Sequence, residues 1–228
     1  MVEFQSRSST RALVDNLRDH DVLEEMLDAS KPSAPEGPQG LHYLLWTPFR
    51  YRPLEHGSRF ATRSEGGLWY GSESLRTAFA EFAYYQLYFL EGPARDLSPI
   101  RRRLSAFSAQ LRTERGVDLT RPPFAAFRAS LSSPSHYGAA QALGTAMRED
   151  GVEVCRYHSA RDKKEGTNVV AFSPRAFHRK KPGPLQTWNC FATRASVELT
   201  RDDIGGRMVE SFAREDFLVD GALPRPAA

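Results

Sequence analysis

Apolar residues recur at helical spacing near the start of the chain, across residues 10–30. Within this stretch, Asp21 and Glu24 form a capping-box pattern, which predicts that a second short helix begins there. Residues 31–40 (KPSAPEGPQG) follow and are rich in proline and glycine, which is typical of a loop. We therefore predict an N-terminal helical arm with its loop, residues 1–40, set apart from the body of the protein.

A strand and a long helix are predicted in the first half of the chain. Residues 68–70 are apolar and aromatic, and the strand they form should end at the following glycine. Ser72 and Ser74 are good helix N-caps, and Gly92 followed by Pro93 is a typical helix stop. The pattern predicts a helix between these signals, and the rest of the chain is expected to be organised around it.

Glu81 lies inside this predicted helix. It is the only acidic residue between Glu73 and Glu91, and its neighbours are mainly alanine, phenylalanine and tyrosine. An ionised carboxylate taken out of water without a partner costs several kcal/mol, so a buried Glu81 requires a cationic partner or a chemical task. The alternative is that Glu81 lies on the flank of the helix and reaches solvent.

The rest of the chain reads mainly as short strands. We expect them at residues 41–46, 107–111, 152–157, 168–172, 185–191, 196–199 and 208–212. One further helix should begin with Ser135 as its cap and end at Asp150 and Gly151. Because strands and helices seldom alternate as βαβ units, the pattern predicts an α+β fold: a single compact domain over residues 41–220, followed by a loose proline- and alanine-rich tail, residues 221–228.

Composition indicates an ordinary globular protein with a mild positive charge. The chain has 228 residues, of which 40% are hydrophobic and 26% charged, so one sizeable core is expected. A net charge of +3 is compatible with anionic ligands but does not require nucleic acid. The two basic runs, 101–103 and 178–181, are expected to be solvated loop faces, and no direct nucleic-acid binding is expected.

Several classes of site have no support in the sequence. The motifs of dinucleotide folds, P-loops, zincins and α/β-hydrolases are absent. Cys155 and Cys190 form no metal or disulfide pattern, and the six histidines are dispersed, so no metal is expected. The N-terminus lacks a signal-peptide pattern, and the apolar run at 82–90 is far shorter than the roughly 20 residues of a membrane span. We expect a cytoplasmic protein without a membrane segment.

Polar residues gather instead in loops and at predicted strand ends. Arg50 and Arg59 flank a glycine-punctuated loop, and an arginine fork suits a phosphate or carboxylate group. Ser159 and Arg161 follow the strand predicted at 152–157. Taken one at a time, such residues are more often exposed or structural than functional.

Five short motifs, taken together, resemble a known family. They are Trp46-x3-Arg50, Gly57-Ser58-Arg59-Phe60, Leu68-Trp69-Tyr70-Gly71, Ala78-x2-Glu81, and Tyr157-His158-Ser159-Ala160-Arg161 with Gly166-x-Asn168. Their order and separations closely resemble the RES domain, which is named for its Arg, Glu and Ser. The resemblance runs from about Leu44 to about Thr200, so the N-terminal arm lies outside it.

The resemblance implies a fold similar to the ADP-ribosyltransferase toxins and NAD as the substrate. It implies the toxin of a bacterial toxin–antitoxin pair that cleaves NAD between nicotinamide and ribose, by hydrolysis or phosphorolysis. A mono-ADP-ribosyltransferase that modifies a cellular protein is the alternative, and a binding module without chemistry is a third possibility. The implied partner is an antitoxin with a helix-turn-helix DNA-binding region, which blocks the NAD pocket in a hetero-oligomer.

The resemblance also assigns the site residues. The catalytic positions are Arg59, Tyr70, Glu81 and Ser159, and the NAD-binding positions are Arg50, Arg59, Tyr70, Ser159, Arg161 and Asn168. Glu81 suits the oxocarbenium-like charge that develops on the ribose, and Arg59 or Arg50 suits the diphosphate. Tyr70 could stack on the nicotinamide ring, and the Ser159 hydroxyl could bind the ribose or the amide.

Overall fold

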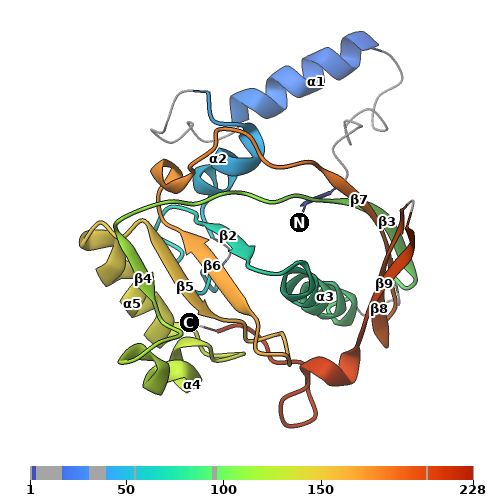
Figure 1. Cartoon of the computed structure of the whole chain (residues 1–228). Coiled ribbons are helices and arrows are strands. Elements are labelled where there is room, and N and C mark those ends of the chain that lie inside the picture. The colour runs from blue at the N-terminus through green and yellow to red at the C-terminus, as the bar shows by residue number, and fades with distance from the viewer. Residues whose placement is uncertain are drawn as a thin grey trace.

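The computed structural model describes residues 2–3, 17–30, 40–53, 55–93, 97–203 and 205–227 (Figure 1). Its elements, in chain order, are β1 (Val2–Glu3), α1 (Leu17–Ser30), α2 (Tyr43–Arg50), β2 (Trp69–Ser72), α3 (Leu75–Glu91), β3 (Ile100–Ala106), β4 (Gly116–Asp118), η2 (Phe124–Phe127), α4 (Arg128–Leu131), α5 (Gly138–Glu149), β5 (Val154–His158), β6 (Thr167–Ala171), η3 (Pro174–Ala176), β7 (Gln186–Ala192), β8 (Ser196–Asp203), β9 (Gly206–Ala213) and η4 (Arg214–Phe217). They form one α+β domain with two sheets, which confirms the predicted class.

The larger sheet has five strands in the order β1-β3-β7-β8-β9, and every neighbouring pair is antiparallel. Alternate residues of its strands point inward, and the register places Leu104 opposite Trp188 and Cys190 opposite Leu199. All four side chains are buried. The alternating pattern of residues 185–212 therefore predicted β7, β8 and β9 correctly.

The smaller sheet has four strands in the order β2-β6-β5-β4. The β2–β6 and β6–β5 pairs are antiparallel, whereas β5 and β4 run parallel. Its register aligns Ser72 with Asn168 and Asn168 with Tyr157, so these three side chains share one face. That face positions much of the site described below.

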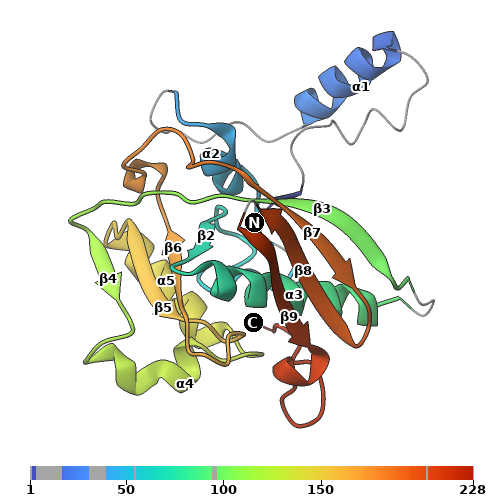
Figure 2. The ribbon, with the colours of Figure 1, turned by 45° about the vertical axis from the view of Figure 1, so that its right-hand side comes forward.

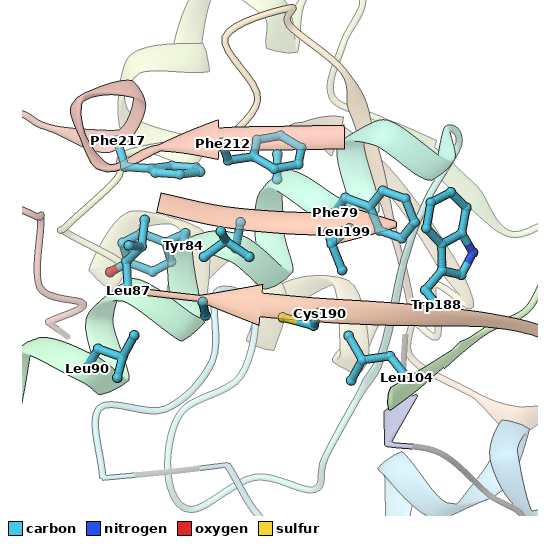
Figure 3. Packing of buried hydrophobic residues seen from close by; sticks show 14 of the residues in the cluster. Phe79, Tyr84, Leu87, Leu90, Leu104, Trp188, Cys190, Leu199, Phe212 and Phe217 are labelled. Atoms are coloured by element: carbon cyan, nitrogen blue, oxygen red, sulfur yellow. The ribbon is translucent and has the colours of Figure 1, made fainter. Parts of the chain in front are cut away.

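Helix α3 lies between the two sheets, as Figures 1 and 2 show. Ser74 caps its first turn by accepting a hydrogen bond from the backbone N–H of Thr77, and the helix ends before Gly92, as predicted. Phe79, Leu87 and Leu90 are completely buried against the five-stranded sheet (Figure 3). Since this apolar side fixes the helix in the core, the opposite side is held rigidly towards the smaller sheet.

Residues 41–46 are not a strand. Most of them belong to α2, where Nδ1 of His42 accepts a hydrogen bond of 3.3 Å from the backbone N–H of Leu44. Leu45 and Phe49, both in α2, are buried in a small cluster with residues of β5, β6 and η3. A short apolar run carries no clear period, so the strand prediction failed where tertiary packing favours a helix.

Residues 107–111 do not form the expected strand. The strand in this region is β3, which ends before them, and within 107–111 only Leu111 makes an isolated bridge, to Phe177. The basic run 101–103 is therefore part of a strand and not of a loop. Arg101 and Arg103 are exposed on the outer face of the sheet, where arginines can alternate with inward-facing residues. The prediction failed because charged residues hid a strand whose outer face is solvated. The second basic run, 178–181, is an exposed loop as expected.

Two helix starts also differ from the prediction. Helix α1 runs without a break through Asp21 and Glu24, so no second helix begins there. Residues 10–16 of the predicted arm and residues 31–39 of its loop lie outside the described residues. Helix α5 begins at Gly138 without a side-chain cap, and the Ser135 hydroxyl lies 3.0 Å from Nδ1 of His136 instead.

The C-terminal residues are packed and not loose. Leu223 is only 5% exposed, and the Pro224 carbonyl accepts a hydrogen bond of 2.5 Å from the Tyr84 hydroxyl. The backbone of Ala227 bonds to Ser135 and Tyr137. A segment rich in proline and alanine carries no periodic signal, so its docking could not be predicted.

The domain boundaries 1–40, 41–220 and 221–228 stay a prediction. Among the described helices, none has the length and apolar character needed to cross a membrane.

Candidate active site

The carboxylate of Glu81 is held by one of its two oxygens. Oε1 accepts hydrogen bonds of 2.6 Å from the Ser159 hydroxyl and 2.6 Å from the Asn168 side-chain amide. Oε2 accepts none from the described residues. Glu81 is half-buried and pairs with no cation among the described residues, and Oε2 is not a buried unpaired atom, so part of the carboxylate reaches solvent, as the alternative from the sequence allowed. One oxygen is fixed and the other is available to a reacting group.

Ser159 orients its proton towards Glu81. It follows β5, and its Oγ accepts hydrogen bonds from the backbone N–H groups of Arg161, at 3.1 Å, and Asp162, at 3.0 Å. A hydroxyl has one proton to donate and two lone pairs that accept. Because two N–H groups occupy the lone pairs, the proton is directed to Glu81.

Asn168 is oriented in the same way from the neighbouring strand β6. The Ser72 hydroxyl donates a hydrogen bond of 2.7 Å to Oδ1 of Asn168, which leaves its NH2 group to donate to Glu81. Ser72 stands directly opposite Asn168 in the sheet register. The two strands therefore fix one of the two donors to the carboxylate.

The loop that carries Ser159 is anchored to the first turn of α3. Asp162 is buried, and its carboxylate forms an ion pair with Arg76 and accepts a hydrogen bond of 2.9 Å from the Thr77 hydroxyl. A Cβ on Gly166 would lie 2.0 Å from the Thr77 hydroxyl, so only glycine fits beside this contact. Thr77 precedes Glu81 by one helical turn, so the anchor fixes the loop relative to the carboxylate.

Arg59 is a buried cation held by neutral groups. Its Nη1 donates hydrogen bonds to the carbonyl oxygens of Leu131, at 3.3 Å, and Ser133, at 2.9 Å. Its guanidinium carbon lies 4.6 Å from the centre of the Tyr137 ring, within the range of a cation–π interaction. These contacts fix the guanidinium without neutralising it.

Arg161 is held in a similar way beside Ser159. Its Nη2 donates a hydrogen bond of 2.6 Å to the Pro134 carbonyl and lies 3.4 Å from the Tyr137 hydroxyl. Its guanidinium carbon lies 3.5 Å from the centre of the Tyr84 ring. Neither Arg59 nor Arg161 forms an ion pair with a carboxylate among the described residues, although both are buried. Two such cations can bind an anionic group such as a diphosphate.

Tyr70 supports the loop that carries Arg59. Its hydroxyl lies 2.9 Å from Oγ of Ser58 and accepts a hydrogen bond of 3.2 Å from the backbone N–H of Phe60. Burial raises the pKa of Tyr70 to about 12, so it is neutral at physiological pH. Its contacts connect β2 to the arginine loop, while its stacking on a ligand ring stays a prediction.

Arg50 stands apart from this arrangement. It ends α2, and its guanidinium carbon lies 5.8 Å from the centre of the Trp46 ring. Helix α2 packs on β2 and η3, and the described contacts do not bring Arg50 into the network around Glu81. The prediction that Arg50 lines the pocket stays a prediction.

An open cavity of about 860 Å³ adjoins the site. Ser159, Arg161 and Asp162 lie on one side of it, and residues of α4 and of the segment 216–219 lie on the others. Among the described residues, no group of three or more His, Cys, Asp or Glu side chains could hold a metal ion. The cavity lining offers charged groups of both signs and hydroxyl groups to an organic molecule of substantial size.

Sequence reasoning missed four supporting residues: Ser72, Asp162, Tyr84 and Tyr137. Tyr84 follows Glu81 by three positions, so the helical period could have placed it on the same side of α3. The sequence indicated Ser72 only as a possible helix cap. Nothing near Tyr137 in the sequence indicates that its side chain contacts two arginines. Contacts between distant segments leave no local pattern.

Comparison with known proteins identifies the family. The model of the RES domain family matches residues 34–192, which is more than half of the chain. No curated protein matches the sequence. The match contains all of the motifs around Arg59, Tyr70, Glu81 and Ser159 that resemble the family. The chain belongs to the RES domain family.

Proposed function

We propose that this protein binds NAD and cleaves the bond between nicotinamide and ribose, as the toxin of a toxin–antitoxin pair. One observation carries the proposal: Glu81, a carboxylate with one fixed oxygen and one without a partner among the described residues, is hydrogen-bonded to Ser159, whose Oγ accepts from the backbone N–H of Arg161, a residue whose buried guanidinium forms no ion pair among them. NAD has a cationic nicotinamide ring and an anionic diphosphate, which match these charges. Membership of the RES family supports the same substrate.

Glu81 stabilises the transition state in this reaction. The C–N bond to C1′ of the ribose breaks, its electron pair goes to the nicotinamide nitrogen, and positive charge develops on the sugar ring. A fixed carboxylate beside that charge lowers the barrier without reorganising as the charge forms. Ser159 and Asn168 hold Oε1, so Oε2 faces the reacting centre.

The two buried arginines bind the diphosphate. Each uses one nitrogen for protein carbonyl groups, and its other N–H groups can bind phosphate oxygens. An anion between them supplies the negative charge that the described residues do not. Binding energy at this remote group then holds C1′ in place at Glu81.

The acceptor of ADP-ribose is water or phosphate in this proposal. Its oxygen forms the new bond to C1′ as the bond to nicotinamide breaks, and its proton passes to solvent, which completes hydrolysis or phosphorolysis. The cavity beside Ser159 is open, which suits a small acceptor, and it also leaves room for the alternative acceptor, a side chain of a cellular protein. The products distinguish these reactions.

Incubation of the purified protein with NAD, with and without phosphate, tests the proposal. Mass spectrometry should detect nicotinamide together with ADP-ribose, or with a phosphorylated ADP-ribose that forms only when phosphate is present. NAD that stays intact under both conditions would contradict the proposal. Nicotinamide release that requires an added protein, with label incorporated into that protein, would favour the transferase.

The toxin role has its own test. We expect expression in a bacterial cytoplasm to lower cellular NAD before growth stops, and co-expression of a cognate antitoxin with a helix-turn-helix region to prevent both effects. The order of events is measured by sampling NAD and cell density after induction. Growth arrest with normal NAD would contradict the NAD-depletion mechanism.

A further inference from the structure

Residues 223–227 lie beyond the stretch that matches the RES domain, yet they pack against the site. The Tyr84 hydroxyl donates a hydrogen bond of 2.5 Å to the Pro224 carbonyl. The backbone N–H of Tyr137 donates one of 2.8 Å to the Ala227 carbonyl, and the Ala227 N–H donates one of 2.7 Å to the Ser135 carbonyl. The segment therefore contacts two tyrosines that come from different helices or their ends.

The rings of these two tyrosines lie against the guanidinium groups of the buried arginines of the site. The Tyr84 ring supports Arg161, whose guanidinium carbon is 3.5 Å from the ring centre. The Tyr137 ring supports Arg59 at 4.6 Å, and the Tyr137 hydroxyl lies 3.4 Å from Nη2 of Arg161. The position of each guanidinium thus depends on where its tyrosine lies.

The C-terminal segment supplies bonds that nothing else in the described chain provides to these two tyrosines. Tyr137 precedes α5, and its backbone N–H belongs to a helix start that has no side-chain cap. Tyr84 is completely buried, and burial raises its pKa to about 12, so its neutral hydroxyl needs an acceptor. Removal of the segment would leave both donors unpaired and free to shift.

We propose that residues 223–227 form a positioning segment. By its bonds to Tyr84 and Tyr137, the segment keeps the guanidinium groups of the two anion-binding arginines in place. The inference rests on the proposed function, because the anion is taken to be the diphosphate of NAD. The segment touches no reacting atom. Its effect is therefore expected on the binding of NAD and not on the chemical step.

Three variants test this role by NAD turnover. A chain that ends at Ala222 removes the segment, and Tyr84→Phe removes only the hydroxyl that bonds Pro224 while it keeps the ring under Arg161. Tyr88→Phe, one turn further along α3, is the matched control. We expect Tyr84→Phe to raise KM for NAD about fivefold with kcat within about twofold, and the shortened chain to raise KM further. Tyr88→Phe should leave both unchanged.

A double-mutant cycle separates positioning from general stability. If Tyr84 acts through Arg161, Tyr84→Phe should raise KM little or not at all in a chain that already carries Arg161→Gln. Independent effects that multiply would overturn the inference, as would an unchanged KM in Tyr84→Phe. Should the shortened chain fail to fold, Tyr84→Phe and the cycle still decide. A wild-type protein that neither binds nor consumes NAD would overturn the proposed function and this inference together, whereas an active wild type with an unchanged Tyr84→Phe overturns only the inference.

Discussion

The Ser159 hydroxyl lies 2.6 Å from Oε1 of Glu81 and donates its proton to it. The two residues come from opposite halves of the chain, the loop after β5 and the middle of α3. Two backbone N–H groups occupy the lone pairs of the Ser159 oxygen, so the hydroxyl has no other way to point. Under the proposed function, Ser159 therefore acts mainly by fixing the catalytic carboxylate.

Ser159→Ala should slow turnover of NAD about tenfold, with a smaller effect on KM. The substitution removes one of two donors to Oε1, which weakens the carboxylate's fixed orientation by about 1–2 kcal/mol. Steady-state kinetics measure the change. Ser173→Ala, which removes a serine that caps the short helix η3, is the control and should keep wild-type turnover. Normal kcat in Ser159→Ala would contradict the orienting role.

Arg59→Lys should weaken NAD binding about tenfold or more although the charge is kept. Lysine cannot reproduce a planar fork that bonds two carbonyl groups, lies over Tyr137 and still offers donors to a diphosphate. Calorimetry with NAD measures the affinity. Arg63→Lys, in the exposed part of the same loop, should bind as the wild type does. Equal affinity in Arg59→Lys would remove Arg59 from the site.

Asp162→Asn should lower both stability and turnover. The variant leaves Arg76 without its buried partner and loosens the loop that carries Ser159, at a cost of about 2 kcal/mol in unfolding free energy. Urea denaturation and NAD turnover measure the two effects. Glu165→Gln removes an exposed ion pair with Arg128 from the same loop and should change stability by less than about 0.5 kcal/mol. Equal stability of the two variants would contradict the anchoring role.

Tyr70→Phe should change how stability depends on alkaline pH. Burial raises the pKa of Tyr70 to about 12, whereas a tyrosine in the unfolded chain has a pKa near 10. The folded protein thus keeps a proton that the unfolded chain loses, so the stability from this group is complete below about pH 10 and is lost as the pH rises towards 12. Unfolding free energy should fall less steeply in Tyr70→Phe across this range. Parallel curves for variant and wild type would contradict the raised pKa of Tyr70.

Local signals predicted the centre of the fold well. The Ser74 cap, the Gly92 stop and the apolar spacing between them define α3, and this helix carries Glu81. Strands β5 to β9 also lie close to short apolar or alternating runs in the sequence. These features depend on neighbours in sequence, so the sequence alone was enough to find them.

Features that depend on distant contacts could not be predicted in this way. The helix α2 forms where a short apolar run meets the outer side of β2, and β3 is hidden by its outward arginines. The docking of residues 223–227 depends on carbonyl groups that any sequence would supply. Similarly, Tyr137 acquires its task only when the start of α5 meets Arg59 and Arg161, and Asp162 only when the loop after β5 meets α3.

Turnover by Glu81→Gln is the most direct measurement of the proposed mechanism. Glutamine keeps the shape of the side chain, and its amide oxygen can still accept from Ser159 and Asn168, so only the charge is removed. Glu91→Gln makes the same change at the end of the same helix, where the carboxylate pairs with Arg214, and serves as the control.

We predict that Glu81→Gln lowers kcat about hundredfold or more, a loss of about 3 kcal/mol in transition-state stabilisation, while NAD affinity stays nearly constant. The melting temperature should hold or rise, because a carboxylate kept for function commonly burdens the folded state. A Glu81→Gln protein that melts at a lower temperature but turns over NAD as fast as Glu91→Gln would contradict the mechanism and make Glu81 a structural residue.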